Sequence, residues 1–565
     1  MLGSPGPIFG VGPQNQAPHR FSHLTLQTDT HTKMPLFDTL PFDNRFTRTL
    51  PGDPLATNSR RQVQGACYSR VHPTPVRAPK LVAWSPEMAE LLGFTPEMVA
   101  SDEFAQIFAG NRVLPGMDPF AMCYGGHQFG NWAGQLGDGR AINLGEMVTP
   151  NDGVWTLQLK GAGPTPYSRR ADGLAVLRSS VREFLCSEAM HHLGVPTTRA
   201  LSLVLTGEEV VRDMFYDGNP QAEPGAVVCR VAPSFLRFGN YEILSSRNEL
   251  GLLRQLVDYT IRTDFPHLGE PNPETIARWF AEICQRTAQM VVGWMRVGFV
   301  HGVMNTDNMS ILGLTIDYGP YGWLEDYDPS WTPNTTDASG RRYAYGNQPK
   351  IAMWNLAQLG NALIPLEGEI EPFQKGLDSY STAFEKGREE MLAQKLGFVQ
   401  FDPATDTDLT NELFQLLRAA ETDMTIFFRS LANLSTGSEI SQLTNTSVRQ
   451  ILAEALYTPA RLEGELLDQW TNWFQVYQAR LLRDGLPDAL RREKMNRANP
   501  KYVLRNYLAQ EAIDLAAQGD FSRVRELLDL LRHPYDEQPG REAFAQKRPD
   551  WARHRAGCSM LSCSS

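Results

Sequence analysis

The sequence lacks features that mark several classes of protein. No apolar run reaches the roughly 18 residues that a membrane span needs, so we expect a soluble protein with no membrane partner. Cysteine is scarce, because seven residues scattered over 565 are too few for a disulfide scaffold, and this indicates a reducing compartment. Basic residues do not predominate: the net charge of -11 argues against non-specific nucleic-acid binding.

The first 34 residues have little that would fold. Residues 1–34 are rich in Gly, Pro, Gln and His without helical or strand periodicity, so we expect a disordered extension. They contain no apolar region typical of a secretory signal, and too few arginines for a transit peptide. We therefore expect a bacterial cytoplasmic protein, or a mitochondrial one if the chain is eukaryotic. At 565 residues, the chain is long enough for two or three subdomains.

The most informative stretch is HGVMNTDNMSILGLTIDYG, residues 301–319. Magnesium on a nucleotide prefers hard oxygen ligands, usually one or two carboxylates or amides together with phosphate oxygens and water. Asn308 and Asp317 can supply such oxygens from two loops, which we expect to be joined by a strand-like hairpin at residues 311–316. The stretch therefore predicts a catalytic loop followed by a metal loop.

The same stretch has the spacing of a protein kinase. Kinases bind metal through the Asn that ends H-R-D-x-x-x-x-N and through the Asp of D-F-G. Asn308 follows His301 at the kinase interval, and Asp317 opens Asp-Tyr-Gly. The kinase base, however, is replaced by Val303, and a carboxylate reappears only at Asp307. This indicates a kinase whose base has moved or been lost.

A glycine-dense segment precedes this stretch, at residues 124–146. Gly134, Gly137 and Gly139 come before Arg140 and a short predicted strand. Glycines allow close approach of the backbone to phosphates, as in nucleotide loops. A set of tight turns explains the same cluster, and the order of the glycines is not the kinase G-x-G-x-x-G.

A lysine and a glutamate follow in kinase order. The strand VWTLQLK ends at Lys160, and we expect a helix over residues 173–192 with Asp172 as its N-cap. Glu183 lies on that helix, where a kinase carries the glutamate that pairs with its strand lysine. Taken alone, a lysine at the end of a strand or a glutamate within a helix is usually a solvated surface residue. Their position between a glycine-rich loop and a metal pair favours an ion pair that holds the ammonium against phosphates.

Two arginines lie between these groups and the catalytic loop. Arg230 falls in an apolar, strand-like run, and Arg237 follows seven residues later. An arginine inside such a strand needs a partner or an anion. A structural salt bridge and a phosphate clamp both satisfy this requirement. Residues 274–297 predict a buried helix that leads the chain to His301.

Long motifs in the sequence resemble the selenoprotein O family, also called the YdiU family. They include GGHQFGNWAGQLGDGRA, RVAPSFLRFGNYEI, HGVMNTDNM, IDYGPYGW and NPKYVLRNYLAQ, and the similarity runs from about residue 37 to the C terminus. The resemblance implies an α/β (α+β) fold of the protein-kinase-like, two-lobe pseudokinase type. It also implies protein adenylyltransferase activity, in which ATP binds inverted relative to kinases and AMP passes to Ser, Thr or Tyr hydroxyls.

The resemblance further implies a role for each candidate residue. Nucleotide contacts would come from Gly137, Gly139, Arg140, Lys160, Asp172, Gly173, Arg230, Arg237 and Asp317. Glu183 would pair with Lys160. Asp307 would be the proton acceptor, although a supporting role beside the metal fits it too. Asn308 and Asp317 would bind Mg²⁺, or Mn²⁺ in its place.

The rest of the chain predicts helices and a tail. We expect a nucleotide-binding region at residues 35–245, a core with the catalytic and metal loops at 246–350, and a helical region at 351–550 that braces that core. Residues 551–565 would form a flexible tail. Cys563 stands where some members of that family carry selenocysteine, with Cys558 five residues before it. Two alternatives stay open for this tail: the two cysteines form a reversible redox pair, or the tail is inert.

Together these observations predict an enzyme with ATP and hydroxyl-bearing proteins as substrates and partners. Two alternatives stay open: a catalytically silent ATP-binding regulator and a conventional protein kinase. The carboxylates Asp307 and Asp317, with Asn308 and Lys160, argue against the first, because a scaffold has no need of a complete metal site. Val303 argues against the second.

Overall fold

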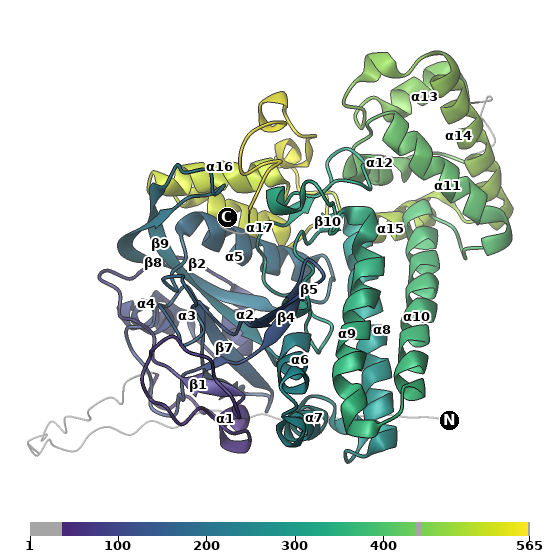
Figure 1. The fold of residues 1–565 in the computed structure, drawn as a ribbon. Coiled ribbons are helices and arrows are strands. Elements are labelled where there is room, and N and C mark those ends of the chain that lie inside the picture. Colours follow the sequence, from purple (N-terminus) through teal and green to yellow (C-terminus); the bar gives the residue numbers. More distant parts are fainter. Residues whose placement is uncertain (1–36, 437–442, 563–565) are drawn as a thin grey trace, which may run out of the picture.

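The structure is a computed structural model that describes residues 37–436 and 443–562. It is a mixed α/β protein with one large antiparallel sheet and many helices, which confirms the expected class (Figure 1). The expected disordered extension at residues 1–34 lies outside the described residues. Seven strands form the sheet in the order β1-β3-β6-β7-β9-β8-β2: β1 (Tyr68–Arg70), β2 (Lys80–Trp84), β3 (Phe120–Met122), β6 (Ala141–Val148), β7 (Val154–Lys160), β8 (Arg199–Arg212) and β9 (Gln221–Ala232).

Helices cover both faces of this sheet, so its central strands are apolar on both sides. Along β9, Val227, Cys229 and Val231 pack against the short helices on one face, which are α2 (Pro86–Leu91), α3 (Pro96–Ala100) and α4 (Asp102–Phe108). The alternate residues face α5 (Leu177–His192) instead. Arg230 belongs to this second set, and so does Lys160 on β7, whose neighbour Leu159 faces the first side. The two-residue period of the strands therefore turns both cations toward α5.

The start of α5 differs from the prediction. Ser85 caps α2 by accepting a hydrogen bond from Met88 N, but Asp172 does not cap α5. Instead the Asp172 carboxylate accepts a hydrogen bond from Leu174 N, and the helix begins only at Leu177. Gly173 has a left-handed backbone (φ +77°), and the chain after it runs extended, forming isolated bridges to neighbouring segments. This turn and the extended run delay the helix by about one turn.

Helices dominate the middle of the chain. α8 (Pro273–Val297) buries the predicted apolar stripe and ends at Gly298, which delivers the chain to β10 (Phe299–Val300). Figure 1 shows α8 beside α9 (Gln348–Glu367) and α10 (Glu371–Leu396). α6 (Phe238–Ser246) and α7 (Leu250–Asp264) connect this bundle to the sheet. The strand-like hairpin expected at residues 311–316 is present only in part: these residues form a turn and loop without a regular strand, closed by an antiparallel bridge between Met309 and Thr315.

The last third of the chain is helical, as predicted, but it braces two regions. The helices α11 (Pro403–Ala419), α12 (Met424–Leu431), α13 (Asn445–Leu452), α14 (Gly464–Asp484) and α15 (Asp488–Ala498) enclose or adjoin a second hydrophobic core around Trp470 and Trp473. α16 (Asn506–Ala517) and α17 (Ser522–Leu531) return to the sheet and pack on α5 (Figure 1). The C-terminal helices therefore support the helix that carries Glu183.

The described part of the tail is packed, which differs from the flexible tail we expected. Leu561 is buried, and its carbonyl accepts a hydrogen bond of 2.7 Å from Thr335 N. Cys558 is buried as well, and burial raises the pKa of its thiol to about 11, which disfavours the thiolate required for oxidation. Cys563 lies outside the described residues. Within the described ranges, no helix is long and apolar enough to cross a membrane.

A buried ion-pair network joins three parts of the chain. Arg505 donates to Glu325 at 2.7 Å and to Asp423 at 2.8 and 3.1 Å, and all three residues are at most 5% exposed. Replacing Arg505 with Met leaves two buried carboxylates without their cation. We expect this change to lower the free energy of unfolding by about 3 kcal/mol in a denaturant titration.

The control for this experiment is an exposed pair. Arg555 contacts Asp514 at 2.7 Å with its side chain 42% exposed. Arg555→Met should therefore cost less than about 1 kcal/mol. Equal losses in the two variants would show that the buried network has no special structural role.

Candidate active site

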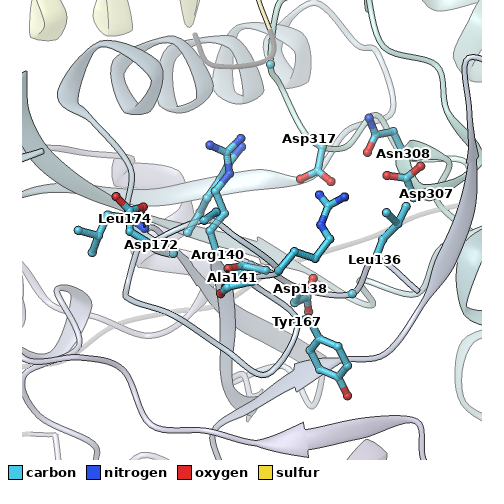
Figure 2. Close-up of a pocket in the computed structure, with 18 of the residues that line it drawn as sticks. Leu136, Asp138, Arg140, Ala141, Tyr167, Asp172, Leu174, Asp307, Asn308 and Asp317 are labelled. Carbon is cyan, nitrogen blue, oxygen red and sulfur yellow. Dashed lines mark hydrogen bonds between the residues drawn. The ribbon is translucent and has the colours of Figure 1, made fainter. Parts of the chain in front are cut away.

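A cavity of about 630 Å³ lies between the sheet, the loop around residues 167–174 and the segment from Val303 to Pro320. Figure 2 shows that carboxylates, an amide and arginine side chains point into it. Its walls include most of the predicted site residues: Gly137, Gly139, Arg140, Lys160, Asp172, Gly173, Arg230, Asp307, Asn308 and Asp317. Glu183 and Arg237 contact these wall residues from behind. The fold therefore brings together side chains separated by up to 180 positions in the sequence.

The first group in the cavity is an ion-pair cluster under α5. Lys160 Nζ, at the end of β7, lies 2.5 Å from Glu183 Oε2, and Arg230 Nη1 on β9 lies 3.1 Å from Glu183 Oε1. The Arg230 guanidinium also contacts Gln158. Burial lowers the pKa of Lys160, and Glu183 opposes that shift. One carboxylate therefore orients two cations toward the cavity, and the predicted Lys160–Glu183 contact is present.

Asp317 is the carboxylate on which the arginines meet. Arg237 Nη1 donates to Asp317 Oδ2 at 2.6 Å, and Arg230 Nη1 contacts Oδ1. Burial alone would raise the pKa of Asp317, but Arg237, Arg230 and Lys160 hold it well below its usual value. Asp317 also has a left-handed backbone (φ +55°), which costs a non-glycine residue free energy. A structural salt bridge and an anion clamp would therefore both use this one cluster of Arg230, Arg237 and Asp317.

The catalytic loop places Asp307 and Asn308 on a single 3₁₀ turn, Thr306–Asn308. Asn308 Nδ2 donates to Val303 O at 3.0 Å, which fixes the amide plane and leaves its oxygen side for another contact. Arg237 donates to the Asp307 carbonyl at 2.7 Å. Burial raises the pKa of the Asp307 carboxyl to about 7, against the opposing effect of Arg237. In Figure 2 the Asp307 and Asp317 carboxylates and the Asn308 amide lie around one end of the cavity.

The glycines of the predicted nucleotide loop allow close packing. Gly137 has φ +72°, and a Cβ there would lie 2.4 Å from the Tyr167 ring. At Gly173, a Cβ would lie 2.2 Å from Gly163 O. Close packing within tight turns therefore explains why these two positions are glycine. The same turns form part of the cavity wall. Asp172 beside them is paired with Arg212 at 2.8 Å.

Some cavity residues were missed by sequence reasoning. Asp138 is 2% exposed and accepts a hydrogen bond of 2.9 Å from Met122 N; burial raises its carboxyl pKa. Gln158 holds Arg230, and Gln128 reaches Asp307. The alternation of β7 could have revealed Gln158, because it shares a strand face with Lys160. Gln128 and Asp138 lie inside the quoted glycine-rich motif, but their spacing has no recognised chemical signature.

The donor set at this end of the cavity fits a hard divalent cation. Asp307, Asn308 and Asp317 offer carboxylate and amide oxygens from two loops. Among the described residues, no group of three His, Cys, Asp or Glu side chains forms a site that could enclose a metal. Few protein ligands are what Mg²⁺ uses when a nucleotide supplies phosphate oxygens.

Comparison with known proteins gives a consistent result. The family described as Protein adenylyltransferase SelO matches residues 55–532. The chain is 63% identical over 536 residues to a protein nucleotidyltransferase YdiU of Rhodopirellula baltica, covering 93% of this chain and 99% of that protein. It is 63% identical over 530 residues to the protein of that name from Aromatoleum aromaticum, with the same coverage. The protein of that name from Nitrosospira multiformis is 55% identical over 564 residues, covering 95% of this chain and all of the relative. The chain is therefore an enzyme of the SelO family of protein adenylyltransferases.

Proposed function

We propose that this enzyme transfers AMP from ATP to Ser, Thr or Tyr hydroxyls of proteins and releases pyrophosphate. The observation that carries the proposal is a cluster of three buried cations next to a loop carboxylate. Lys160, Arg230 and Arg237 gather at one place, while Asp307 lies on the loop beside it. Such an arrangement suits a departing polyphosphate next to a group that takes a proton.

The arrangement also supports a kinase-like two-lobe fold with altered use of its parts. A strand lysine paired with a helix glutamate, and an Asn and an Asp from successive loops, are the kinase constellation. Val303 has no carboxylate to act as the kinase base. We therefore infer that ATP binds with its α-phosphate, rather than its γ-phosphate, toward Asp307, so that the arginines meet the β- and γ-phosphates.

The reaction follows from these positions. The acceptor hydroxyl oxygen attacks the α-phosphorus and loses its proton to Asp307. The bond from the α-phosphorus to the α,β-bridging oxygen breaks, and its electron pair leaves with pyrophosphate. Arg230, Arg237 and Lys160 stabilise that charge, and Glu183 keeps Lys160 oriented. A bound Mg²⁺ or Mn²⁺, held by Asn308 and Asp317, would supply further neutralisation of the phosphates.

Asp317 has to exchange partners in this account. In the structure its two oxygens contact Arg230 and Arg237. A triphosphate offers these guanidiniums more oxygens and more negative charge than one carboxylate does. We infer that nucleotide binding draws the arginines to phosphate and frees the carboxylate for the cation.

Mass spectrometry tests the proposed chemistry. Acceptor proteins incubated with the enzyme, ATP and Mg²⁺ should gain AMP on Ser, Thr or Tyr, with one pyrophosphate released per adduct. Phosphate adducts instead of AMP would identify a kinase. Bound ATP with no adduct would identify the silent regulator.

Because the matched relatives are bacterial proteins, we propose that the reaction takes place in the cytoplasm.

Asn308 should set the affinity for the metal. Asn308→Ala removes one of the proposed ligands, and we expect the Mg²⁺ concentration for half-maximal AMP transfer to rise roughly tenfold. The measurement is a metal titration at saturating ATP. Asn131→Ala, an exposed amide on a nearby hairpin, is the matched control. An unchanged midpoint in Asn308→Ala would remove Asn308 from the metal site.

A further inference from the structure

The hairpin formed by β4 (Gly125–Gln128) and β5 (Asn131–Gln135) has no role in the chemistry described so far. It is separate from the seven-stranded sheet and packs on the 3₁₀ turn that carries Asp307. Its two-residue turn, Phe129–Gly130, has positive φ at both positions (52° and 86°). That is the backbone of a tight hairpin turn, but phenylalanine rarely adopts it.

Contacts with the catalytic loop hold this turn in place. Phe129 N donates to Asn305 Oδ1 at 3.2 Å and to the Tyr343 hydroxyl at 3.0 Å. His127 N donates to Thr306 Oγ1 at 2.7 Å. The hairpin therefore grips consecutive residues of the loop just before Asp307.

The next contact reaches Asp307 itself. Gln128 Nε2 donates to Asp307 Oδ2 at 3.4 Å, a long bond. The other oxygen, Oδ1, is buried with no hydrogen-bond partner among the described residues. An unpaired buried carboxylate oxygen is costly for stability.

The hairpin backbone restrains the same carboxylate by contact. A Cβ placed on Gly126 would lie 2.7 Å from Asp307 Oδ1 and 2.9 Å from its Cβ. The absence of a side chain at Gly126 thus allows the strand to lie directly against Asp307. Together Gly126 and Gln128 bound the carboxylate on both of its oxygens.

We propose that the β4–β5 hairpin positions Asp307 for proton transfer: Gly126 lies against Oδ1, and Gln128 is a positioning residue that donates to Oδ2, the oxygen left to meet the acceptor hydroxyl. This inference rests on the proposed function, in which Asp307 takes the proton. Gln128 acts through Asp307 and is not itself a catalytic residue. Its removal should slow the transfer step without weakening the binding of either substrate.

The test is a kinetic comparison of Gln128→Met, which keeps the side-chain length and removes the donor. The acceptor is a synthetic peptide that spans a site modified in the mass spectrometry experiment. We expect kcat for AMP transfer to fall tenfold or more, while the peptide KM and the ATP Kd stay within twofold. Gly126→Ala, whose new methyl group displaces Asp307, should give at least the same loss. Gln469→Met on α14, which removes an exposed glutamine that donates to Glu465 at 3.3 Å, should stay within twofold of the original enzyme.

A double-mutant cycle separates positioning from a general structural effect. In an Asp307→Asn background, rates are measured at high enzyme concentration over long incubations. There Gln128→Met should lower the rate of AMP transfer less than twofold, because the proton acceptor that Gln128 positions is absent. Normal kcat in Gln128→Met, or equal losses in both backgrounds, would overturn the inference. An unmodified enzyme that transfers no AMP would instead overturn the proposed function.

Discussion

Asp317→Asn should reduce AMP transfer by at least about 10³-fold, equivalent to about 4 kcal/mol of transition-state stabilisation. The change removes the negative charge of a proposed metal ligand, which among the described residues is also the only carboxylate that contacts both Arg230 and Arg237. Initial rates at saturating ATP and Mg²⁺ measure the loss. ATP binding without metal should persist, because the freed guanidiniums can still meet phosphates.

The same substitution should also destabilise the protein in the absence of nucleotide. Arg230 and Arg237 are at most 3% exposed, so loss of the Asp317 charge leaves buried cations with less compensation. We expect the free energy of unfolding to fall by about 2 to 3 kcal/mol. Asp118→Asn is the matched control, because Asp118 pairs with Arg70 at 2.9 Å on the surface. Full AMP transfer in Asp317→Asn would show that the reaction does not need the negative charge of Asp317.

Lys160→Met should lower kcat/KM for ATP by about 10² to 10³-fold. The ammonium is buried between β7 and α5, where Glu183 holds it 2.5 Å away and low solvent access strengthens its attraction for phosphate. Lys160→Arg should not restore the rate, because a planar guanidinium cannot replace a compact ammonium beside Arg230. Steady-state kinetics over a range of ATP concentrations give the values.

The control for Lys160 is a lysine on the same sheet outside the cavity. Lys80 begins β2 and is exposed. Lys80→Met should therefore leave kcat/KM within twofold. If Lys160→Met behaves like this control, the ion pair with Glu183 is structural and does not serve the nucleotide.

The Lys160–Glu183 contact could be predicted from the sequence, for a physical reason. Lys160 and Arg230 lie on strands whose alternation fixes the face of each side chain, and Glu183 lies inside a long helix against that face. Regular elements place side chains predictably. The 25-residue helix α8 was equally clear, because its apolar stripe is sustained over its whole length.

Prediction was poorer where tertiary contacts override local preference. Asp172 looked like an N-cap, but the left-handed Gly173 and the extended residues after it postpone the helix. The return of α17 to the sheet region depends on contacts such as Arg532 with Glu87, which are 445 positions apart. The packing of Cys558 is equally non-local. No periodicity in the sequence encodes such pairings.

The hairpin shows the same limitation within the site. Gln128 and Asp307 are 179 positions apart, and nothing in the glycine-rich motif or in the catalytic loop predicts that the two segments are in contact. The structure adds that link, together with the convergence of Arg230 and Arg237 on Asp317. Both are properties of the folded chain, and both bear on the direction in which ATP binds.

The most direct test of this account is label transfer from ATP that carries an isotope on either the α- or the γ-phosphate. Acceptors would be the enzyme itself and proteins of a cell lysate, with Asp317→Asn as the inactive control. We expect label to move to protein from the α-position alone, and Asp317→Asn to abolish this transfer. Label arriving from the γ-position would mean phosphoryl transfer and would contradict the inverted orientation of the nucleotide.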